Sequence, residues 1–253
     1  MVAETRSSTI SAGLLIPVWD EFMTSDNPKI IRKKSYQQAV LEIYDAPYAA
    51  FYPTYWNEGC TKKNLGNLQC IHELLDIGGN WLDLCCGTAW HFSMVSTPCQ
   101  KTGLDLSPAQ LSVARADHPE CRFLQGDVLE IEPIPEYDLV TSFWMAYGYL
   151  DDVGMIEQFC KQMVAWLKPG GNLILEVGDG QLASTWNTTH RAASSIFRVF
   201  KRTDDWLKWS FFDVGGVHNL TTPPYSFFDE VLGPYFHAQE RRFDTNWCGL
   251  GRK

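Results

Sequence analysis

The sequence predicts an α/β fold in which a mostly parallel sheet carries helices on both faces and follows an N-terminal helical segment. Two observations lead to this prediction. From residue 80 onward, short apolar runs alternate with segments whose apolar residues recur at helical spacing. Before residue 77, the chain has helical spacing and no clear strand pattern. Strands that alternate with helices are typical of parallel sheets with right-handed crossover connections.

The N-terminal segment is predicted to be helical up to a glycine pair. Apolar residues recur at helical spacing over 30–57, where Pro47 and Pro53 interrupt the pattern. A further helix over 64–77 is expected to end at the Gly-Gly pair that follows it, because glycine readily adopts the left-handed conformation that terminates helices.

The repeated strand–turn–helix pattern covers residues 80–179. Ser107 is a good N-cap and Pro108 suits the first helical position, so a helix is expected to start there. A Lys-Pro-Gly-Gly run over 168–171 ends the last helix of the pattern. The expected strands are 80–86, 100–107, 121–128, 137–144 and 172–179. The expected helices are 89–97, 107–118 and 152–171.

The C-terminal part is less regular. Alternating aromatic and charged residues over 197–214 predict a β-hairpin that turns at Asp204-Asp205. A short helix is expected over 224–234, and two final strands, 236–243 and 247–253, could close the sheet. Because no linker or repeat interrupts the chain, we expect one domain over 1–253, with a helical cap (1–76), a core (77–180) and a closing segment (181–253).

Composition and charge exclude several classes of partner. Hydrophobic residues make up 45% of the chain and charged residues 20%, which is typical of soluble globular proteins. The formal net charge of -9 argues against a nucleic-acid backbone as partner, because phosphate binding requires a basic surface. No signal-peptide pattern and no apolar run of membrane-span length is present, so we expect a cytoplasmic protein without a membrane partner. The sequence leaves the oligomeric state open.

The eight cysteines do not form a metal-binding pattern. They include no Cys-x-x-Cys pair, and no histidine lies at the spacing that zinc ligands need. The adjacent Cys85 and Cys86 are therefore expected to be reduced thiols that serve as small residues in a turn, and no metal is expected.

The residues that follow the strands carry the strongest functional signal. In open parallel sheets, ligands bind beyond the carboxyl ends of the strands. Small residues occupy positions 85, 87 and 89 after the first strand, and Asp105 lies twenty-two residues beyond Asp83. A carboxylate at about that distance is well placed to accept both ribose hydroxyls of an adenosine ligand. Asp127 follows the third strand, where it could accept from the adenine amino group.

The order of these motifs resembles that of the class I S-adenosylmethionine-dependent methyltransferases. The matching segments are LDLCCGTA, GLDLS, GDV, YDLVTSFWMAYGYL and LKPGGNLILEV. The resemblance follows the element order over about 36–253 and is sharp only over 80–178. It implies a Rossmann-like sheet of seven strands, the last one antiparallel, which binds S-adenosylmethionine.

The resemblance also implies a set of cofactor-binding residues on the loops that follow the strands. Two of them depart from the family's pattern, since Cys85 and Ala89 stand where the family has glycine. A positive φ at Cys85 would cost energy, whereas Ala89 is expected to need only close helix–strand packing. The implied residues are Asp83, Cys85, Gly87, Ala89, Asp105, Leu106, Gly126, Asp127, Val128 and Phe143.

Aromatic residues, 13% of the chain, point to the methyl acceptor. Those near the predicted site imply a closed, largely apolar pocket for a hydrophobic, aromatic small molecule such as an alkaloid, methylated on nitrogen or oxygen. His190 and Tyr147 are the candidate catalytic residues, whereas His91 is expected to be a helix-face histidine, either packed or solvated. The candidate acceptor-binding residues are Tyr52, Trp56, Trp144, Tyr147 and His190.

Three alternatives remain at this stage. A methyltransferase that acts on RNA or protein would share the fold, but the acidic balance of the chain opposes it. An NAD(P)-dependent oxidoreductase is opposed by the spacing of small residues over 85–89, which differs from a dinucleotide-binding turn. A non-catalytic binding protein is conceivable because Cys85 replaces a glycine.

Overall fold

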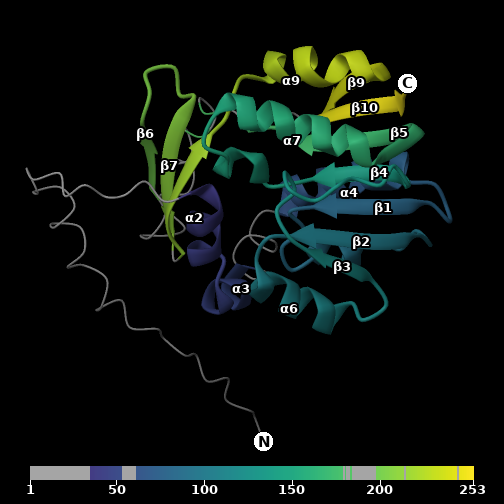
Figure 1. The fold of residues 1–253 in the computed structure, drawn as a ribbon, viewed down its shortest axis with the longest axis horizontal. Helices are drawn as coiled ribbons and strands as arrows, with labels where there is room; N and C mark the ends of the chain where they lie inside the picture. Colours follow the sequence, from purple (N-terminus) through teal and green to yellow (C-terminus); the bar gives the residue numbers. More distant parts are fainter. Residues whose placement is uncertain are drawn as a thin grey trace, which may run out of the picture. The chain divides into compact units, whose positions relative to one another are not determined.

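A mixed sheet of seven strands forms the centre of the computed structural model, which describes residues 35–52, 61–178, 180, 183, 198–213, 215–243 and 245–253 (Figure 1). The strands lie in the order β3-β2-β1-β4-β5-β10-β9. All neighbours pair in parallel except β10, which is antiparallel to both β5 and β9. The bounds are β1 Asn80–Leu84, β2 Gln100–Asp105, β3 Arg122–Gln125, β4 Tyr137–Ser142, β5 Leu167–Glu176, β9 Phe236–Arg242 and β10 Asn246–Arg252. The predicted Rossmann-like sheet with an antiparallel last strand is confirmed.

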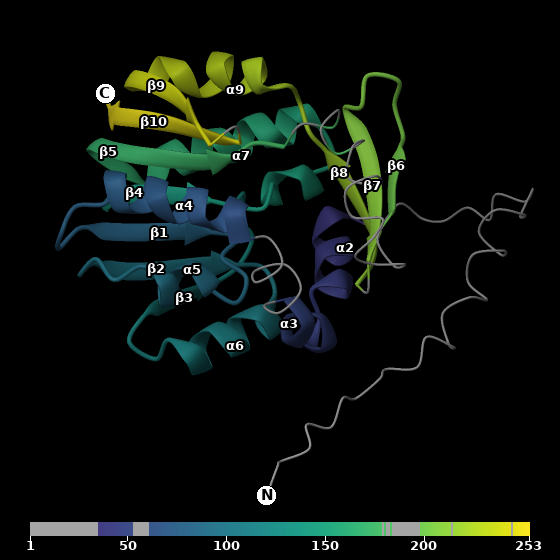
Figure 2. The same ribbon diagram turned by 180° about the vertical axis from the view of Figure 1, so that it is seen from behind.

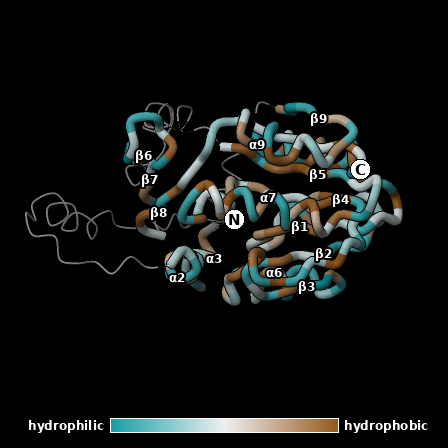
Figure 3. The backbone as a smooth tube through the Cα atoms, turned by 45° about the horizontal axis from the view of Figure 1, so that its top comes forward, coloured by the Kyte–Doolittle hydropathy of each residue, from teal (hydrophilic) through white to brown (hydrophobic). Residues whose placement is uncertain are grey.

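Helices cover both faces of this sheet (Figures 1 and 2). Successive residues of a strand point to opposite faces, so Leu82 and Leu84 of β1 face one side and Trp81 the other. The first side packs against α7 (Val153–Trp166) and α9 (Tyr225–Leu232). The second side packs against α4 (Thr61–Leu74), α5 (Trp90–Met94) and α6 (Pro108–Asp117). Figure 3 shows hydrophobic stretches along the central strands, as burial on both faces requires.

The boundary between α7 and β5 differs from the prediction. The helix ends at Trp166 instead of running to residue 171, and the Lys-Pro-Gly-Gly run already belongs to β5. Pro169 explains the early end, because the residue before a proline avoids the helical conformation. Gly170 has φ 82°, and the pairing of β4 with β5 shifts register between Tyr137 and Leu139.

Three strands form a second, smaller sheet at the carboxyl ends of the main strands (Figure 1). The predicted hairpin is confirmed as β6 (Arg198–Lys201) and β7 (Lys208–Asp213), which pair antiparallel. β8 (Gly216–Thr221) was not predicted and pairs with β7. The second sheet has a small hydrophobic cluster of its own, which includes the buried side chains of Trp209 and Leu220. We refer to β6, β7 and β8 as the small sheet.

The described part of the expected N-terminal cap is helical. It contains α2 (Tyr36–Ile43), α3 (Ala46–Tyr52) and α4. The side chain of Ser35 caps α2 by accepting a hydrogen bond from the backbone N–H of Gln38. α2 lies beside the small sheet at the carboxyl ends of the main strands (Figure 2). In the described residues, the helices are too short or too polar to cross a bilayer.

Candidate functional site

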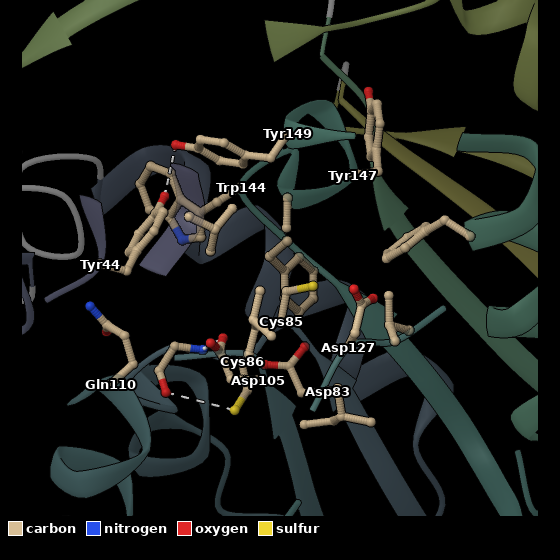
Figure 4. A pocket seen from close by; sticks show the side chains of 18 of the residues that line it. Tyr44, Asp83, Cys85, Cys86, Asp105, Gln110, Asp127, Trp144, Tyr147 and Tyr149 are labelled. Atoms are coloured by element: carbon tan, nitrogen blue, oxygen red, sulfur yellow. Dashed lines mark hydrogen bonds between the residues drawn. The ribbon is translucent and has the colours of Figure 1, made fainter. Parts of the chain in front are cut away.

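A pocket lies where the carboxyl ends of β1, β2 and β4 meet the cap (Figure 4). It comprises about 1000 Å³ of empty space, including the open solvent at its mouth. Figure 4 shows Asp83, Asp105 and Asp127 on one side of the pocket and the rings of Tyr44 and Tyr149 on the other. The position agrees with the rule that ligands bind beyond the carboxyl ends of parallel strands.

The loop between β1 and α5 adopts the left-handed conformation at every second residue. The φ angles are 58° at Cys85, 56° at Gly87 and 57° at Ala89. Backbone hydrogen bonds hold this geometry, from the N–H of Cys86 to the carbonyl of Leu104 (3.1 Å) and from the N–H of Ala89 to the carbonyl of Cys86 (2.9 Å). Left-handed φ at a residue with a Cβ costs about 1–2 kcal/mol, so Cys85 and Ala89 are both strained. Ala89 therefore requires more than close packing.

Cys85→Gly is expected to stabilise the protein by about 0.5–1 kcal/mol, because glycine removes the strain but gains freedom in the unfolded chain. Urea denaturation measures the change, and affinity for S-adenosylhomocysteine should be unchanged or higher. The neighbouring Cys86→Gly is the control. Cys86 has no positive φ and its sulfur packs against Gly103, so this variant should be destabilised. Loss of stability in Cys85→Gly would contradict the account of strain.

The two loop thiols are held in their protonated form. Burial, with the nearby charge of Asp105, raises the pKa of both Cys85 and Cys86 well above its usual value. A protonated thiol is a poor nucleophile and a poor metal ligand. Among the described residues, the cysteines are free thiols. Cys85 and Cys86 therefore serve as small side chains in the loop. Elsewhere, His118, Glu120 and Cys121 bring potential ligand atoms within 4.8 Å of one another, and these residues do not line the pocket.

Asp105 joins the loop to the end of β2. Its Oδ2 accepts a hydrogen bond from the N–H of Gly87 (2.8 Å), and its Oδ1 accepts from the N–H of Ser107 (2.8 Å). The residue is only 8% exposed, and burial raises its pKa although these N–H groups oppose the shift. A carboxylate oxygen has two lone pairs, so each oxygen can accept one further hydrogen bond. The side chain faces the pocket, and its loop contacts leave it able to bind a diol.

Asp83 ends a short buried chain of hydrogen bonds. The indole N–H of Trp81 donates to Oγ1 of Thr141 (2.9 Å), and the hydroxyl of Thr141 donates to Oδ1 of Asp83 (2.6 Å). Burial raises the pKa of Asp83 to about 7, with a contribution from the charge of Asp105, while the bond from Thr141 opposes the shift. A cation in the pocket would favour the charged form of Asp83.

Asp127 connects the cap to the third strand end. Its Oδ2 accepts hydrogen bonds from the hydroxyl of Tyr36 and from the amide of Gln37 (2.6 Å), both in α2. Its Oδ1 accepts from the N–H of Leu129 (2.9 Å). The neighbouring Gly126, Val128 and Leu106 also line the pocket. α2 therefore closes the side of the pocket next to β3.

The rings of Phe143 and His91 pack against each other in a tilted arrangement in the pocket wall. Their ring centroids lie 4.4 Å apart at an interplanar angle of 33°. His91 is 4% exposed, and its Nε2 has no hydrogen-bond partner among the described residues. Burial, with the charge of Lys63, lowers the pKa of His91 to about 3. The imidazole is therefore neutral near pH 7, and of the two expected arrangements of this helix-face histidine, packed or solvated, it adopts the packed one.

The segment after β4 contains a strained turn. Trp144 and Met145 have φ angles of 59° and 53°. The carboxylate of Glu176 supports this turn by accepting from the N–H of Trp144 (3.0 Å) and from Nζ of Lys63 (2.8 Å). Glu176 is 2% exposed, and its hydrogen bonds give it a structural role. Two consecutive left-handed residues without glycine are rare and tend to occur at functional sites.

Of the candidate catalytic and acceptor-binding residues, the structure describes the side chains of two. Trp144 and Tyr147 line the pocket. The hydroxyl of Tyr147 accepts a hydrogen bond from the N–H of Gly178 (2.9 Å), and Figure 4 shows it pointing away from the three carboxylates. His190, Trp56 and the side chain of Tyr52 lie outside the described residues. The cofactor-binding candidates all line the pocket except Ala89, which is buried beneath the loop.

The predicted catalytic and acceptor-binding residues did not include a second group, although Tyr149 belongs to the aromatic segment that predicted the acceptor site. Tyr44 and Tyr149 line the pocket, and Tyr149 is hydrogen-bonded to His218, which in turn contacts Asp213. Asp213 and His218 flank the turn between β7 and β8. The Gly-Gly pair at 215–216 is a hairpin signal that could have placed these two side chains together.

Comparisons with known proteins agree with this fold. Residues 82–171 match the family described as a methyltransferase domain. The chain is 26% identical over 110 residues (43% of this chain, 44% of the relative) to dTDP-4-amino-2,3,4,6-tetradeoxy-D-glucose N,N-dimethyltransferase of Saccharopolyspora spinosa. It is 32% identical over 137 residues (54% of this chain, 47% of the relative) to trans-aconitate 2-methyltransferase of Delftia acidovorans. The chain thus spans less than half the length of these two curated relatives.

A solved structure shares the fold over most of the described chain. It is that of SAM-bound CalS10, an amino pentose methyltransferase from Micromonospora echinaspora involved in calicheamicin biosynthesis. The TM-score is 0.58 at 19% identity, and the match covers 80% of this chain and 96% of that one. Residues 82–171 therefore resemble a methyltransferase domain, within a chain that has the Rossmann-like fold seen in class I S-adenosylmethionine-dependent methyltransferases.

Proposed function

We propose that this protein transfers a methyl group from S-adenosylmethionine to a nitrogen or oxygen atom of a small molecule. Methyl transfer is an in-line displacement at a sulfonium, so the enzyme acts chiefly by positioning the reactants and excluding water. The pocket beneath the cap suits this task, because side chains of α2, the β1–α5 loop and the segment after β4 all contribute to its wall.

The observation that carries the proposal is the placement of three carboxyl groups around one pocket. Asp83, Asp105 and Asp127 follow or end successive strands and face the same space. S-adenosylmethionine carries a sulfonium and an ammonium group, and carboxylates attract both. Asp105 is assigned to the ribose hydroxyls, Asp127 to the adenine side and Asp83 to the methionine end.

The same charges oppose a dinucleotide. The pyrophosphate of NAD is anionic, and it binds to basic side chains or to backbone N–H groups at a helix N-terminus that have no other hydrogen-bond partner. Here the loop is followed by α5, which is only five residues long, and the N–H of Gly87 is already bonded to Asp105. These contacts favour the methyltransferase over the oxidoreductase.

The acceptor is proposed to be a small molecule held between aromatic rings. Tyr44, Trp144 and Tyr149 line the end of the pocket away from the carboxylates, and Phe143 also lines the pocket. Aromatic faces bind apolar rings and also stabilise a nearby cation. Two of the similar proteins are named for amino sugars, so an amine acceptor belongs to this proposal as well as the aromatic one. The net charge of -9 disfavours RNA as the acceptor.

Calorimetry of the full chain with S-adenosylhomocysteine and with NADH separates the two classes of enzyme. We expect S-adenosylhomocysteine to bind with one-to-one stoichiometry and NADH to give no heat of binding. Heat with NADH alone would contradict the proposed function. Absence of heat with both S-adenosylhomocysteine and S-adenosylmethionine would contradict it equally.

A further inference from the structure

A chain of hydrogen bonds runs from the pocket wall into the small sheet. The hydroxyls of Tyr44 and Tyr149 lie 2.9 Å apart, as the dashed line in Figure 4 marks. The hydroxyl of Tyr149 lies 2.5 Å from Nδ1 of His218. Nε2 of His218 lies 2.7 Å from Oδ1 of Asp213. The chain thus connects a pocket-lining hydroxyl to a carboxylate through a single imidazole.

The contact between His218 and Asp213 determines which group donates in each of these hydrogen bonds. A carboxylate is an acceptor only, so Nε2 of His218 carries the proton and donates it to Asp213. In a neutral imidazole the other nitrogen is then an acceptor, so the hydroxyl of Tyr149 donates to Nδ1. The hydroxyl of Tyr44 must in turn donate to Tyr149. Every bond in the chain therefore points from the pocket toward Asp213.

The far end of the chain is buried and holds a charged carboxylate. Asp213 and His218 are 0% exposed, and the ring of Phe211 stacks on His218 at 4.1 Å and 12°. Oδ2 of Asp213 accepts from the hydroxyl of Tyr48 (2.6 Å). Burial raises the pKa of Asp213, but the bonds from His218 and Tyr48 outweigh it and leave the pKa below its ordinary value. A buried negative charge beside an imidazole stabilises its protonated form.

We propose that Tyr149, backed by His218 and Asp213, removes the proton from the methyl acceptor's nucleophilic nitrogen or oxygen. This inference rests on the proposed function. Tyr149 is the catalytic residue because it faces the acceptor side of the pocket, whereas His218 and Asp213 act through it. Tyr44 orients Tyr149 through its donated hydrogen bond.

The proton and the electron pairs balance in this step. The acceptor's proton passes to the oxygen of Tyr149 as the tyrosine's own proton passes to Nδ1 of His218. The nucleophile's lone pair forms the new bond to the methyl carbon, and the carbon–sulfur pair stays on sulfur, which leaves S-adenosylhomocysteine. His218 is then an imidazolium paired with Asp213, and it releases one proton to solvent through the reverse path.

Two other pocket residues are poorly placed for this role. His91 has a pKa of about 3 and no carboxylate behind it in the described chain. The hydroxyl of Tyr147 already accepts from the backbone N–H of Gly178. Neither residue combines a pocket-facing donor with a buried charge that could hold the proton.

Ring ¹⁵N NMR of histidine tests the ground state without any acceptor. In the full chain with S-adenosylhomocysteine, we expect the proton of the neutral His218 ring to lie on Nε2. Tyr149→Phe should shift the Nδ1 signal, and Tyr225→Phe, which removes a buried hydroxyl of α9 outside the network, should leave Nδ1 unchanged. A proton on Nδ1 would overturn the proposal, because such an imidazole cannot take the proton of Tyr149.

Methyl-transfer rates test the catalytic role. The probe is S-[methyl-d₃]adenosylmethionine with the low-molecular-mass fraction of source-cell extract, analysed by mass spectrometry. His218→Asn retains an acceptor for Tyr149 but cannot bind the proton, so we expect kcat to fall about 10²-fold. Affinity for S-adenosylhomocysteine, measured by calorimetry, should change less than about threefold. Tyr225→Phe should lower kcat less than about threefold, because Tyr225 lies in α9 and does not line the pocket.

The pH dependence separates a proton acceptor from a structural support. The groups that face His218 are Tyr44 from the end of α2, Tyr48 from α3, Tyr149 from the segment after β4, and Asp213 from β7. Asp213 is the charged one among these. A proton acceptor must be unprotonated to act, so we expect the wild-type kcat to rise with pH and His218→Asn to lose that limb.

The outcomes distinguish this inference from the proposed function. Equal rates in wild type and His218→Asn, or equal losses in His218→Asn and Tyr225→Phe with an unchanged pH limb, would overturn the role of Tyr149 and leave the proposed function intact. No labelled small molecule from the wild type, despite binding of S-adenosylhomocysteine, would overturn both.

Discussion

Asp105→Ala is expected to weaken the binding of S-adenosylhomocysteine by more than about tenfold, since a ligand diol loses two charge-assisted hydrogen bonds. The oxygens of Asp105 each bond one backbone N–H, and each retains a lone pair toward the pocket. The variant also frees the N–H groups of Gly87 and Ser107, which loosens the loop. Titration calorimetry measures the affinity directly.

Asp138→Ala is the matched control for this loss. Asp138 also accepts a hydrogen bond from a backbone N–H, that of Asn80 (2.9 Å), but it lies at the opposite end of the sheet. Its removal should lower stability and leave ligand affinity within about threefold. Unchanged affinity in Asp105→Ala would refute the ribose role, and equal losses in both variants would assign the effect to stability.

The second large effect is a pH-dependent penalty at Asp83. Its pKa is about 7 in the folded protein, against 3.8 for an ordinary aspartate, because burial disfavours the charge. The folded state therefore keeps a proton that the unfolded state releases, and stability falls as pH rises from about 4 to about 7. Asp83→Asn removes this penalty. Its stability relative to wild type should increase by about 2–3 kcal/mol between pH 5 and pH 8.

Urea denaturation at the two pH values measures this change. Asp138→Asn is the control, because the N–H of Asn80 and the charge of Lys168 outweigh partial burial and lower the pKa of Asp138. A lowered pKa contributes stability that is lost only below the ordinary pKa, so this variant should show no change between pH 5 and pH 8. If the difference in unfolding free energy between Asp83→Asn and wild type were the same at pH 5 and pH 8, the raised pKa of Asp83 would be contradicted.

The core of the fold was predictable because its signals are local. Each strand from β1 to β5 is a short apolar run, and each following turn carries small, acidic or helix-capping residues. Parallel strands place their carboxyl ends at one edge, so Asp83, Asp105 and Asp127 could be assigned to one pocket from the sequence. Because Cys85 stands where the family has glycine, the sequence indicated that a positive φ there would cost energy, and the structure has φ 58° at this residue.

The acceptor side was less predictable because its contacts are distant in sequence. Tyr44, Tyr149 and His218 are separated by at least 69 residues along the chain, and the strand that carries His218 alternates weakly between apolar and polar residues. No local pattern marks a side chain whose partner lies in another sheet. For the same reason Tyr147, and not Tyr149, was predicted as a catalytic residue. The ring of Tyr147 packs against Phe228 of α9, and the sequence does not reveal this tertiary contact.

The most direct test of the central claim is the fate of a labelled methyl group. The full chain would be incubated with S-[methyl-d₃]adenosylmethionine and the low-molecular-mass fraction of source-cell extract, and products would be identified by mass spectrometry. The account predicts a small molecule that carries one CD₃ group on nitrogen or oxygen, formed in equal amount with S-adenosylhomocysteine. Label recovered only in a parallel reaction to which RNA or protein is added, or no S-adenosylhomocysteine at all, would contradict it.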